Sequence, residues 1–250
     1  MWDTLKLIKK TLLLLVAFMG LAFAGPNDVI SEGLSLPVSQ KSVDLIIYYE
    51  SGTREYYDKY LTRPTVPAWQ TTSSGVTVCI GNDLGMMTKD QIRKAFTGVA
   101  TEKEIQLMQS VSGMTGKNAY YNGLPKVRNL LRFDYNQAEK VFTNYTMPVF
   151  TKQTKDAFSL APTTLHPHSN GALTSLVFNR GPSLANTDSR KEMRWIKYNI
   201  ANDKVENVPS DILSMRRLWS REKLKGLWLR REAESRLFQQ GLDTRKAEIK

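Results

Sequence analysis

Two carboxylates have the surroundings that hydrolytic chemistry would need. Glu50 follows the apolar run VDLIIYY, and Asp83 comes soon after a second apolar run, GVTVCI. Hydrolysis of a glycosidic bond commonly uses two carboxyl groups, one protonated to assist the leaving oxygen and one ionised to activate water. The acid needs a partly apolar setting, which the sequence supplies around Glu50. Glu50 is therefore a candidate for the acid and Asp83 for the second carboxylate, with Glu55 and Asp58 as competing candidates for the second role. From the residues alone, the alternative is that each is an ordinary surface carboxylate.

Metal-dependent and cysteine-dependent hydrolysis have weaker support. The two histidines, His166 and His168, lie in a Pro-rich loop without a helical HExxH motif, whereas zinc enzymes usually draw two or three His ligands from their own chain. Cys79 could be a nucleophile, but a free cysteine in an apolar run is more often a small buried hydrophobe. No GxSxG or SxxK motif is present. We expect no metal and no cofactor.

Aromatic side chains after Glu50 could form a sugar-binding surface. Tyr56, Tyr57, Tyr60 and Trp69 are amphipathic aromatics that suit a wet cleft. Packing in the core is the alternative for about half of them. Tyr57 and Trp69 are the two that we expect to contact substrate.

Asn179 and Arg180 follow the apolar segment LTSLVF. They could line the cleft, with the guanidinium facing a substrate carboxylate. A structural role at the end of a helix is an equally open reading. The many Lys and Arg side chains of residues 216–236, Arg230 and Arg231 included, alternate with glutamates, so we expect a solvated helical surface there.

The pattern of apolar residues predicts a mainly helical α+β fold. Ser42 is a plausible N-cap for a short helix that carries Glu50, with Gly52 as its stop. Residues 53–74 read as a loop with one helical turn, and residues 75–80 as a strand or hairpin arm in the N-terminal third.

The chain is predicted to be helical from Thr88 onward. Thr101 and Glu104 form a capping-box pattern, and loops are expected at residues 160–170 and 181–188.

The N-terminus has the anatomy of a signal peptide. Lys6, Lys9 and Lys10 precede an apolar run at residues 12–24 that ends in Ala22-Phe23-Ala24. This run is shorter than the roughly 20 residues of a membrane-spanning helix, so cleavage is favoured over a retained anchor. We expect a signal peptide at 1–24, a linker at 25–41, one domain at 42–242 and a polar tail at 243–250, with no membrane span once the signal is removed.

The charge of the chain suggests an anionic partner. The full sequence carries a net charge of +11 and a single cysteine. An exported chain with one cysteine forms no internal disulfide, so packing must supply its stability. In the cell envelope nucleic acid is an unlikely partner, and peptidoglycan or an anionic membrane surface fits better.

Three segments together resemble a known family. Glu50, the loop YYDKYLTRPTVPAW and the motif SGVTVCIGNDLG are similar to the phage-type lysozyme group, especially its pesticin-like bacterial branch. That branch has an isolated catalytic Glu on a first helix and a hairpin written roughly SGVTIGIGYDLG. LTSLVFNRG (173–181) resembles the family's buried central helix, and residues 214–242 resemble its closing helices. The resemblance spans residues 42–242.

This resemblance implies a lysozyme-like domain with muramidase activity. Glu50 would be the general acid, Thr77 would orient water, and Asp83 would be the second carboxylate. Other phage lysozymes place that carboxylate six residues before the Thr, where this chain has Thr71. The chain also departs from the family at Cys79, where Gly is usual, and at Asn82, where Tyr or His is usual.

The expected function is therefore cleavage of the β-1,4 bond between N-acetylmuramic acid and N-acetylglucosamine, by a protein that is periplasmic or secreted. The alternative is a catalytically degenerate relative that binds peptidoglycan in envelope assembly or secretion.

Overall fold

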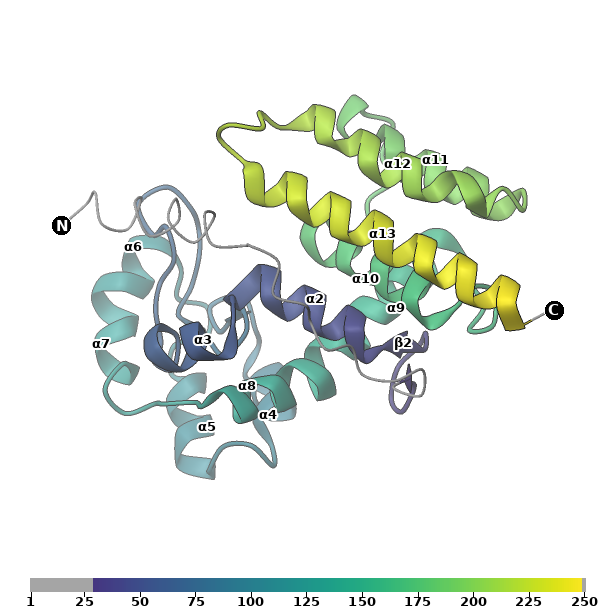
Figure 1. Cartoon of the computed structure of the whole chain (residues 1–250). Helices are drawn as coiled ribbons and strands as arrows, with labels where there is room; N and C mark the ends of the chain where they lie inside the picture. The colour runs from purple at the N-terminus through teal and green to yellow at the C-terminus, as the bar shows by residue number, and fades with distance from the viewer. Residues whose placement is uncertain (1–28, 249–250) are drawn as a thin grey trace. The chain divides into compact units, whose positions relative to one another are not determined.

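The structure is a computed structural model, and it describes residues 29–248. The predicted signal peptide at 1–24 lies outside the described residues and stays a prediction. The chain forms two compact units (Figure 1): unit 1 is Met1–Leu45 with Lys152–Lys250, and unit 2 is Ile46–Thr151. Two helices contribute residues to both units, α2 (Gln40–Ser51) and α9 (Met147–Phe158).

Unit 2 holds the hairpin and the smaller helices. Thr101 and Glu104 form the capping box that the sequence predicts, and Thr88 also caps its helix. Each box satisfies backbone N–H groups that a helix start leaves without partners. The elements are α3 (Arg54–Tyr60), β3 (Thr77–Val78), β4 (Asn82–Asp83), α4 (Lys89–Phe96), α5 (Glu102–Gln109), α6 (Gly116–Asn118), the π-helix η1 (Ala119–Gly123), α7 (Leu124–Val127), α8 (Tyr135–Val141) and the π-helix η2 (Phe142–Thr146).

Unit 1 is built around one buried helix. Helix α10 (Pro167–Arg180) is buried along residues 169–177 and packs against α13 (Lys225–Glu248), as Figure 1 shows. The prediction of a buried helix in this segment is confirmed. The other elements are β1 (Val29–Ile30), β2 (Val38–Ser39), the 3-10 helix η3 (Asp188–Arg190), α11 (Lys191–Ala201), the 3-10 helix η4 (Val205–Asn207), α12 (Val208–Ser214) and the 3-10 helix η5 (Met215–Leu218).

Two arginines of α13 are buried, so the prediction of a solvated surface is wrong at these positions. Arg230 and Arg231 are 2% and 0% exposed, and Glu234, one turn further along, is completely buried. Glu234 Oε1 lies 3.2 Å from Arg230 Nε and 2.9 Å from Arg231 Nη2, and it accepts a hydrogen bond from Ser175 Oγ at 2.6 Å. The shared glutamate compensates for part of the charge that the two arginines bury.

The expected linker and tail are more structured than the sequence suggests. Strands β1 and β2 pair antiparallel within residues 25–41, and Leu36 and Val38 are completely buried. The apolar side chains in this polar segment account for the difference, because burying them removes apolar surface from water. Helix α13 continues through the expected tail to Glu248, since DTRKAE contains good helix formers and no Gly or Pro.

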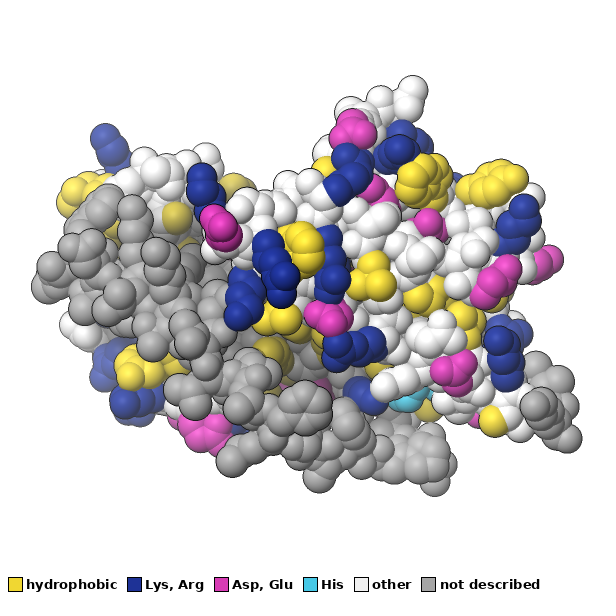
Figure 2. All heavy atoms as spheres, turned by 45° about the horizontal axis from the view of Figure 1, so that its top comes forward, with side chains coloured by type: hydrophobic (Ala, Val, Ile, Leu, Met, Phe, Trp, Pro, Cys, Tyr) yellow, Lys and Arg dark blue, Asp and Glu magenta, His cyan; other side chains and the backbone are white. Residues whose placement is uncertain are grey.

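The fold is thus mainly helical with a small antiparallel hairpin near the N-terminal third, as predicted. Among the described residues, no helix is both long and apolar enough to span a bilayer. Lys and Arg side chains are spread over the face seen in Figure 2, interspersed with acidic and hydrophobic ones.

Candidate functional site

Glu50 lies in the last turn of α2. The helix buries Val43, Ile46 and Ile47 on one side and ends at Ser51. Ser51 Oγ donates a hydrogen bond to the carbonyl of Ile47 at 3.0 Å. Glu50 itself is exposed, which differs from the partly apolar setting expected of it. By its spacing from Val43, Ile46 and Ile47, Glu50 lies on the same helical face as these buried residues. It is exposed because it lies in the last turn, where the helix ends at Ser51.

The hairpin brings Thr77 and Asp83 directly opposite each other. Strand β3 pairs antiparallel with β4 in a register that aligns Thr77 with Asp83 and Val78 with Asn82. Side chains of directly opposite residues lie on the same face of the pair, with Cβ atoms about 4.5–5.5 Å apart. Thr77 and Asp83 are both half-buried. The two residues that the resemblance assigns to positioning water are therefore neighbours.

The carboxylate of Asp83 holds the base of this hairpin together. The backbone N–H of Gly75 donates to both of its oxygens, at 3.1 and 2.9 Å, and the N–H of Gly85 donates to Oδ1 at 2.9 Å. The hydroxyl of Thr77 donates to the carbonyl of Gly75 at 3.3 Å. Hydrogen bonds to an ionised acceptor are stronger than neutral ones. Asp83 therefore has a structural role whether or not it also acts in catalysis.

Glycine is required at both ends of the motif SGVTVCIGNDLG. A Cβ on Gly75 would lie 2.3 Å from Asp83 Oδ1 and 2.5 Å from the Cα of Gly85. A Cβ on Gly85 would lie 2.3 Å from the carbonyl oxygen of Met114. No side chain fits at these distances, so the motif's glycines follow from the close approach of backbone to backbone.

Cys79 lies in the turn of the hairpin, and the prediction that it continues the strand is wrong. Strand β3 ends at Val78, and Cys79 adopts a left-handed conformation with φ of 51°. Glycine adopts such a φ without strain, which gives a physical reason for the usual Gly at this position. The thiol is buried, as expected, and burial raises its pKa well above the ordinary value. A thiol in this state is a poor nucleophile.

Tyr57 is not available to a substrate, so its prediction as a binding residue is wrong. It is completely buried, its ring packs edge-on against Tyr135 at 5.7 Å between centroids, and its hydroxyl donates to the carbonyl of Phe133 at 3.4 Å. Tyr57 faces the core because α3 is amphipathic. The neighbouring Tyr60 is 54% exposed and contacts Tyr56, with ring centroids 4.9 Å apart.

Glu55 and Asp58, the competing carboxylates, both have local roles in or next to α3. Glu55 lies in the first turn of the helix, and hydrogen bonds from the backbone and from Thr53 lower its pKa. Asp58 Oδ1 accepts a hydrogen bond from the backbone N–H of Tyr135 at 3.2 Å. Neither contact excludes a second role.

Trp69 is partly exposed, as a substrate-binding residue must be. Its ring stacks on Tyr120, with centroids 4.2 Å apart and an interplanar angle of 16°, and meets Tyr121 edge-on at 5.3 Å. The sequence reading missed Tyr120 and Tyr121. The sequence signal for these two residues was the pair of adjacent tyrosines in NAYYNG, which asparagines and a glycine flank.

Asn179 and Arg180 belong to unit 1, whereas Glu50, Thr77, Asp83, Tyr57 and Trp69 belong to unit 2. Both residues line a pocket of about 240 Å³, together with Ser189, Arg190, Trp219 and Leu227.

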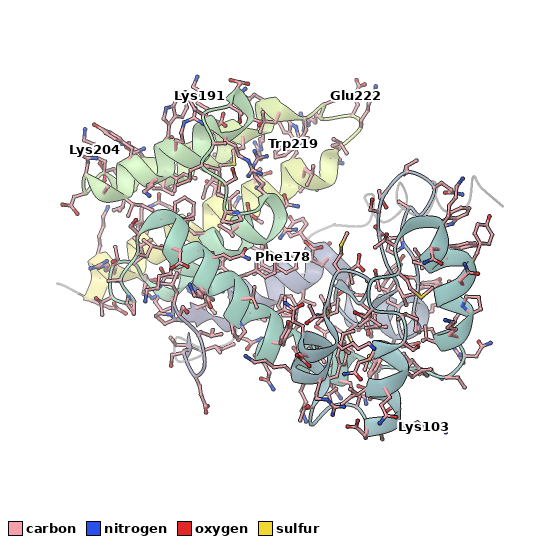
Figure 3. All side chains as sticks on the ribbon, turned by 180° about the vertical axis from the view of Figure 1, so that it is seen from behind. Lys103, Phe178, Lys191, Lys204, Trp219 and Glu222 are labelled. Atoms are coloured by element: carbon pink, nitrogen blue, oxygen red, sulfur yellow. The ribbon has the colours of Figure 1, made fainter. Side chains whose placement is uncertain are left out.

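The pocket of unit 1 is basic. Burial and the nearby charges of Arg190 and Arg231 lower the pKa of Arg180 to about 10. The Arg180 guanidinium lies over the ring of Trp219, which Figure 3 labels, at 5.2 Å from its centroid. Arg231 Nη2 donates to Asn179 Oδ1 at 3.2 Å.

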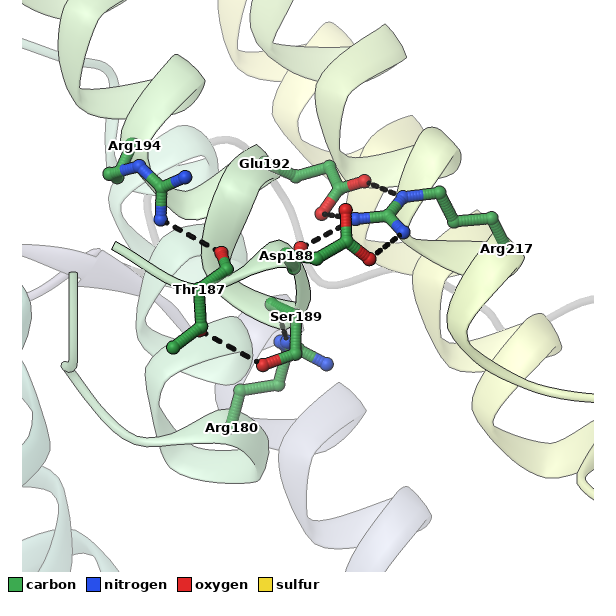
Figure 4. A network of polar contacts seen from close by, with 7 residues as sticks. All are labelled: Arg180, Thr187, Asp188, Ser189, Glu192, Arg194 and Arg217. Carbon is green, nitrogen blue, oxygen red and sulfur yellow. Dashed lines mark hydrogen bonds and ion pairs between the residues drawn. The ribbon is translucent and has the colours of Figure 1, made fainter. Parts of the chain in front are cut away.

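Arginines also hold the loop beside this pocket. Arg180 donates to the carbonyl of Ser189, and Arg194 donates to the carbonyl of Thr187 at 3.0 Å (Figure 4). Arg217 bonds Asp188 at 2.6 Å and also pairs with the buried Glu192. The contact with Ser189 supports a structural role for Arg180. Arg180 also lines the pocket, where its guanidinium can contact a ligand.

The two histidines lie side by side, with ring centroids 4.8 Å apart. Burial, together with the charges of His166 and Lys41, lowers the pKa of His168 to about 4. Within residues 29–248, no group of three or more His, Cys, Asp or Glu side chains is arranged to hold a metal ion.

Comparison with known proteins assigns no family. No protein-family model matches this chain, and no curated protein is significantly similar to it in sequence. The residues of the candidate site are therefore what indicates a function.

Proposed function

We propose that this protein is an exported peptidoglycan glycoside hydrolase, a muramidase that cleaves the β-1,4 bond between N-acetylmuramic acid and N-acetylglucosamine. One observation carries the proposal. The motif SGVTVCIGNDLG folds into a hairpin that aligns Thr77 with Asp83, in the same compact unit as Glu50. This arrangement agrees with the order and spacing on which the resemblance to the pesticin-like lysozymes is based.

In this proposal Glu50 protonates the leaving oxygen of the glycosidic bond. The hydroxyl of Thr77 positions the attacking water, and the charge of Asp83 stabilises the cationic transition state or activates that water. Asp83 Oδ2 accepts one hydrogen bond, from Gly75. A carboxylate oxygen has further lone-pair capacity, so it can accept a second bond from water.

The degenerate, peptidoglycan-binding relative is the competing proposal. The exposed position of Glu50 favours it, because Glu50 lacks the partly apolar surroundings expected of a catalytic acid. Retention of Glu50, Thr77 and Asp83 together favours the enzyme, because binding alone does not require that set of residues.

Digestion of purified sacculi separates the two. A muramidase should release soluble fragments and new reducing ends with time, and Glu50→Gln should lower the rate at least about a hundredfold, since general acid catalysis contributes roughly 10²–10⁴-fold. Glu206→Gln, at an exposed glutamate of η4 in unit 1, is the matched control and should keep the wild-type rate. Binding to sacculi without any new reducing ends would favour the binding protein instead.

A further inference from the structure

Three aromatic side chains of unit 2 form one cluster at the surface. Trp69, Tyr120 and Tyr121 contact one another, with centroids 4.2, 5.3 and 5.1 Å apart. Tyr120 is 37% exposed and Tyr121 is 61% exposed. Large aromatic rings left in water forgo the free energy of burial, so a cluster of them at the surface is a candidate contact for a ligand. We call these three residues the aromatic platform.

A π-helix presents the two tyrosines. Tyr120 and Tyr121 are consecutive in η1, and both rings contact Trp69. The wider turn of a π-helix makes this possible, because consecutive side chains are closer in direction than in an α-helix. Single π-turns within helices occur frequently at functional sites.

The platform is joined to the hairpin that carries Thr77 and Asp83. Gly75 and Thr115 form an isolated β-bridge, and the N–H of Gly116 donates to the carbonyl of Ser74 at 2.9 Å. Trp69 lies on the segment that leads into Ser74 and Gly75. The two tyrosines lie on the segment that follows Thr115 and Gly116. The platform and the hairpin are therefore joined by backbone hydrogen bonds within unit 2.

The segments that carry the platform are rich in neutral hydrogen-bonding groups. Residues 69–74 read WQTTSS and residues 118–123 read NAYYNG, and the exposed Lys117 and Lys126 lie just outside the second stretch. Asn118 and Asn122 are exposed and bond each other at 2.9 Å. The composition of these two stretches differs from that of the whole chain, in which 35 residues are Lys or Arg. Nucleic acid or an anionic lipid surface would require a cluster of cations at the contact, whereas Lys117 is a single cation within four residues of the tyrosines.

We propose that the aromatic platform is a saccharide subsite, which takes an N-acetylated sugar ring of a glycan strand against Tyr121 and the exposed part of Tyr120. The apolar face of a pyranose ring packs on an aromatic ring, and its hydroxyl and acetamido groups bond to neutral amide and hydroxyl side chains such as those of Asn122 and Thr71. Trp69 stacks on Tyr120 and so supports its ring. The identity of the glycan rests on the proposed function, but the subsite does not depend on cleavage.

Binding to peptide-free glycan strands, prepared from peptidoglycan with an amidase, tests the subsite. The Glu50→Gln background prevents the ligand from being cut. In that background Tyr121→Ala should weaken binding roughly five- to tenfold, as expected for loss of one aromatic contact, while Tyr121→Phe should bind as the parent does. Tyr198→Ala is the matched control, because Tyr198 is 57% exposed on α11 in unit 1, and it should have no effect.

Tryptophan fluorescence supplies a second readout. Saturating glycan should change the emission of the parent, and Trp69→Phe should remove that change. Thermal melts of each variant establish that it is folded. The subsite is wrong if the parent binds no glycan, if Tyr121→Ala binds like the parent, or if Tyr198→Ala weakens binding equally. Failure of the muramidase proposal is a separate result, namely glycan binding through Tyr121 by a wild-type protein that generates no reducing ends.

Discussion

At the scale of single residues, Asp83 combines a structural role with a proposed chemical one. Its carboxylate is held by the N–H groups of Gly75 and Gly85. An amide in its place would aim an NH₂ group at one of these donors. The resemblance to a family points only to the catalytic role, because a motif does not show which backbone groups a side chain will meet.

Asp83→Asn should therefore lower the free energy of unfolding by about 1–3 kcal/mol, the cost of leaving buried partners unsatisfied. Urea denaturation measures this loss. Asp156→Asn, which removes an exposed ion pair with Lys152, should cost less than about 1 kcal/mol. Equal stability of the two variants would show that the carboxylate does not hold the hairpin. Activity per folded molecule should in addition fall at least about tenfold if Asp83 also acts in catalysis.

Cys79 should be unreactive in the folded protein. Its side chain is 8% exposed and burial raises its pKa, so little thiolate is available to a reagent. Labelling with a disulfide reagent at pH 8 should be slow without denaturant and fast in urea. Labelling at the same rate in both would place the thiol at the surface and reopen the alternative in which Cys79 is a nucleophile.

At the scale of elements, the sequence predicted features that depend on neighbouring residues better than features that depend on tertiary packing. The Thr101 and Glu104 capping box could be predicted because a cap depends on nearby residues, and the burial of α10 was expected from the resemblance to a family. Burial of Tyr57 and Arg231 could not, because it depends on which distant segments pack against α3 and α13. The sequence also predicted Cys79 in a strand, because its apolar neighbours do not indicate that Cys79 adopts a left-handed turn conformation.

The hairpin should be intolerant of side chains at its glycines. Gly75→Ala introduces a Cβ within 2.6 Å of three atoms of Asp83 and Gly85. We expect it to cost about 1–3 kcal/mol or more, as overpacking does, and to lower activity with it. Gly226→Ala in α13 is the matched control, because nothing lies within 4 Å of its added methyl group. That change should be neutral or stabilising by up to about 1 kcal/mol. A wild-type melting temperature for Gly75→Ala would contradict the geometry of the motif.

At the scale of the whole molecule, the proposed function requires export. The mature protein should begin at Gly25 when the chain is expressed with its own N-terminus in a bacterial host, because Ala22 and Ala24 occupy the positions that signal peptidase reads. N-terminal sequencing of the envelope fraction measures this. Ala24→Lys should block processing and leave a longer form. An intact wild-type Met1 form in the inner membrane would favour an anchored protein over a released enzyme.

The basic charge of the chain and its two compact units agree with either an enzyme or a binding protein. The two are distinguished by whether the glycosidic bond of the glycan strand is cut. If it is cut, the stereochemical course depends on the separation of the two carboxylates.

Mass spectrometry of the fragments released from peptidoglycan tests the proposed cleavage most directly. The wild-type protein should release disaccharide-peptides whose reducing end is N-acetylmuramic acid, and Glu50→Gln should release them at least about a hundredfold more slowly. Borohydride reduction before the measurement marks the new reducing end. Fragments that end in reducing N-acetylglucosamine, free peptides released from intact glycan, or an undiminished rate from Glu50→Gln would each contradict a muramidase with Glu50 as its acid.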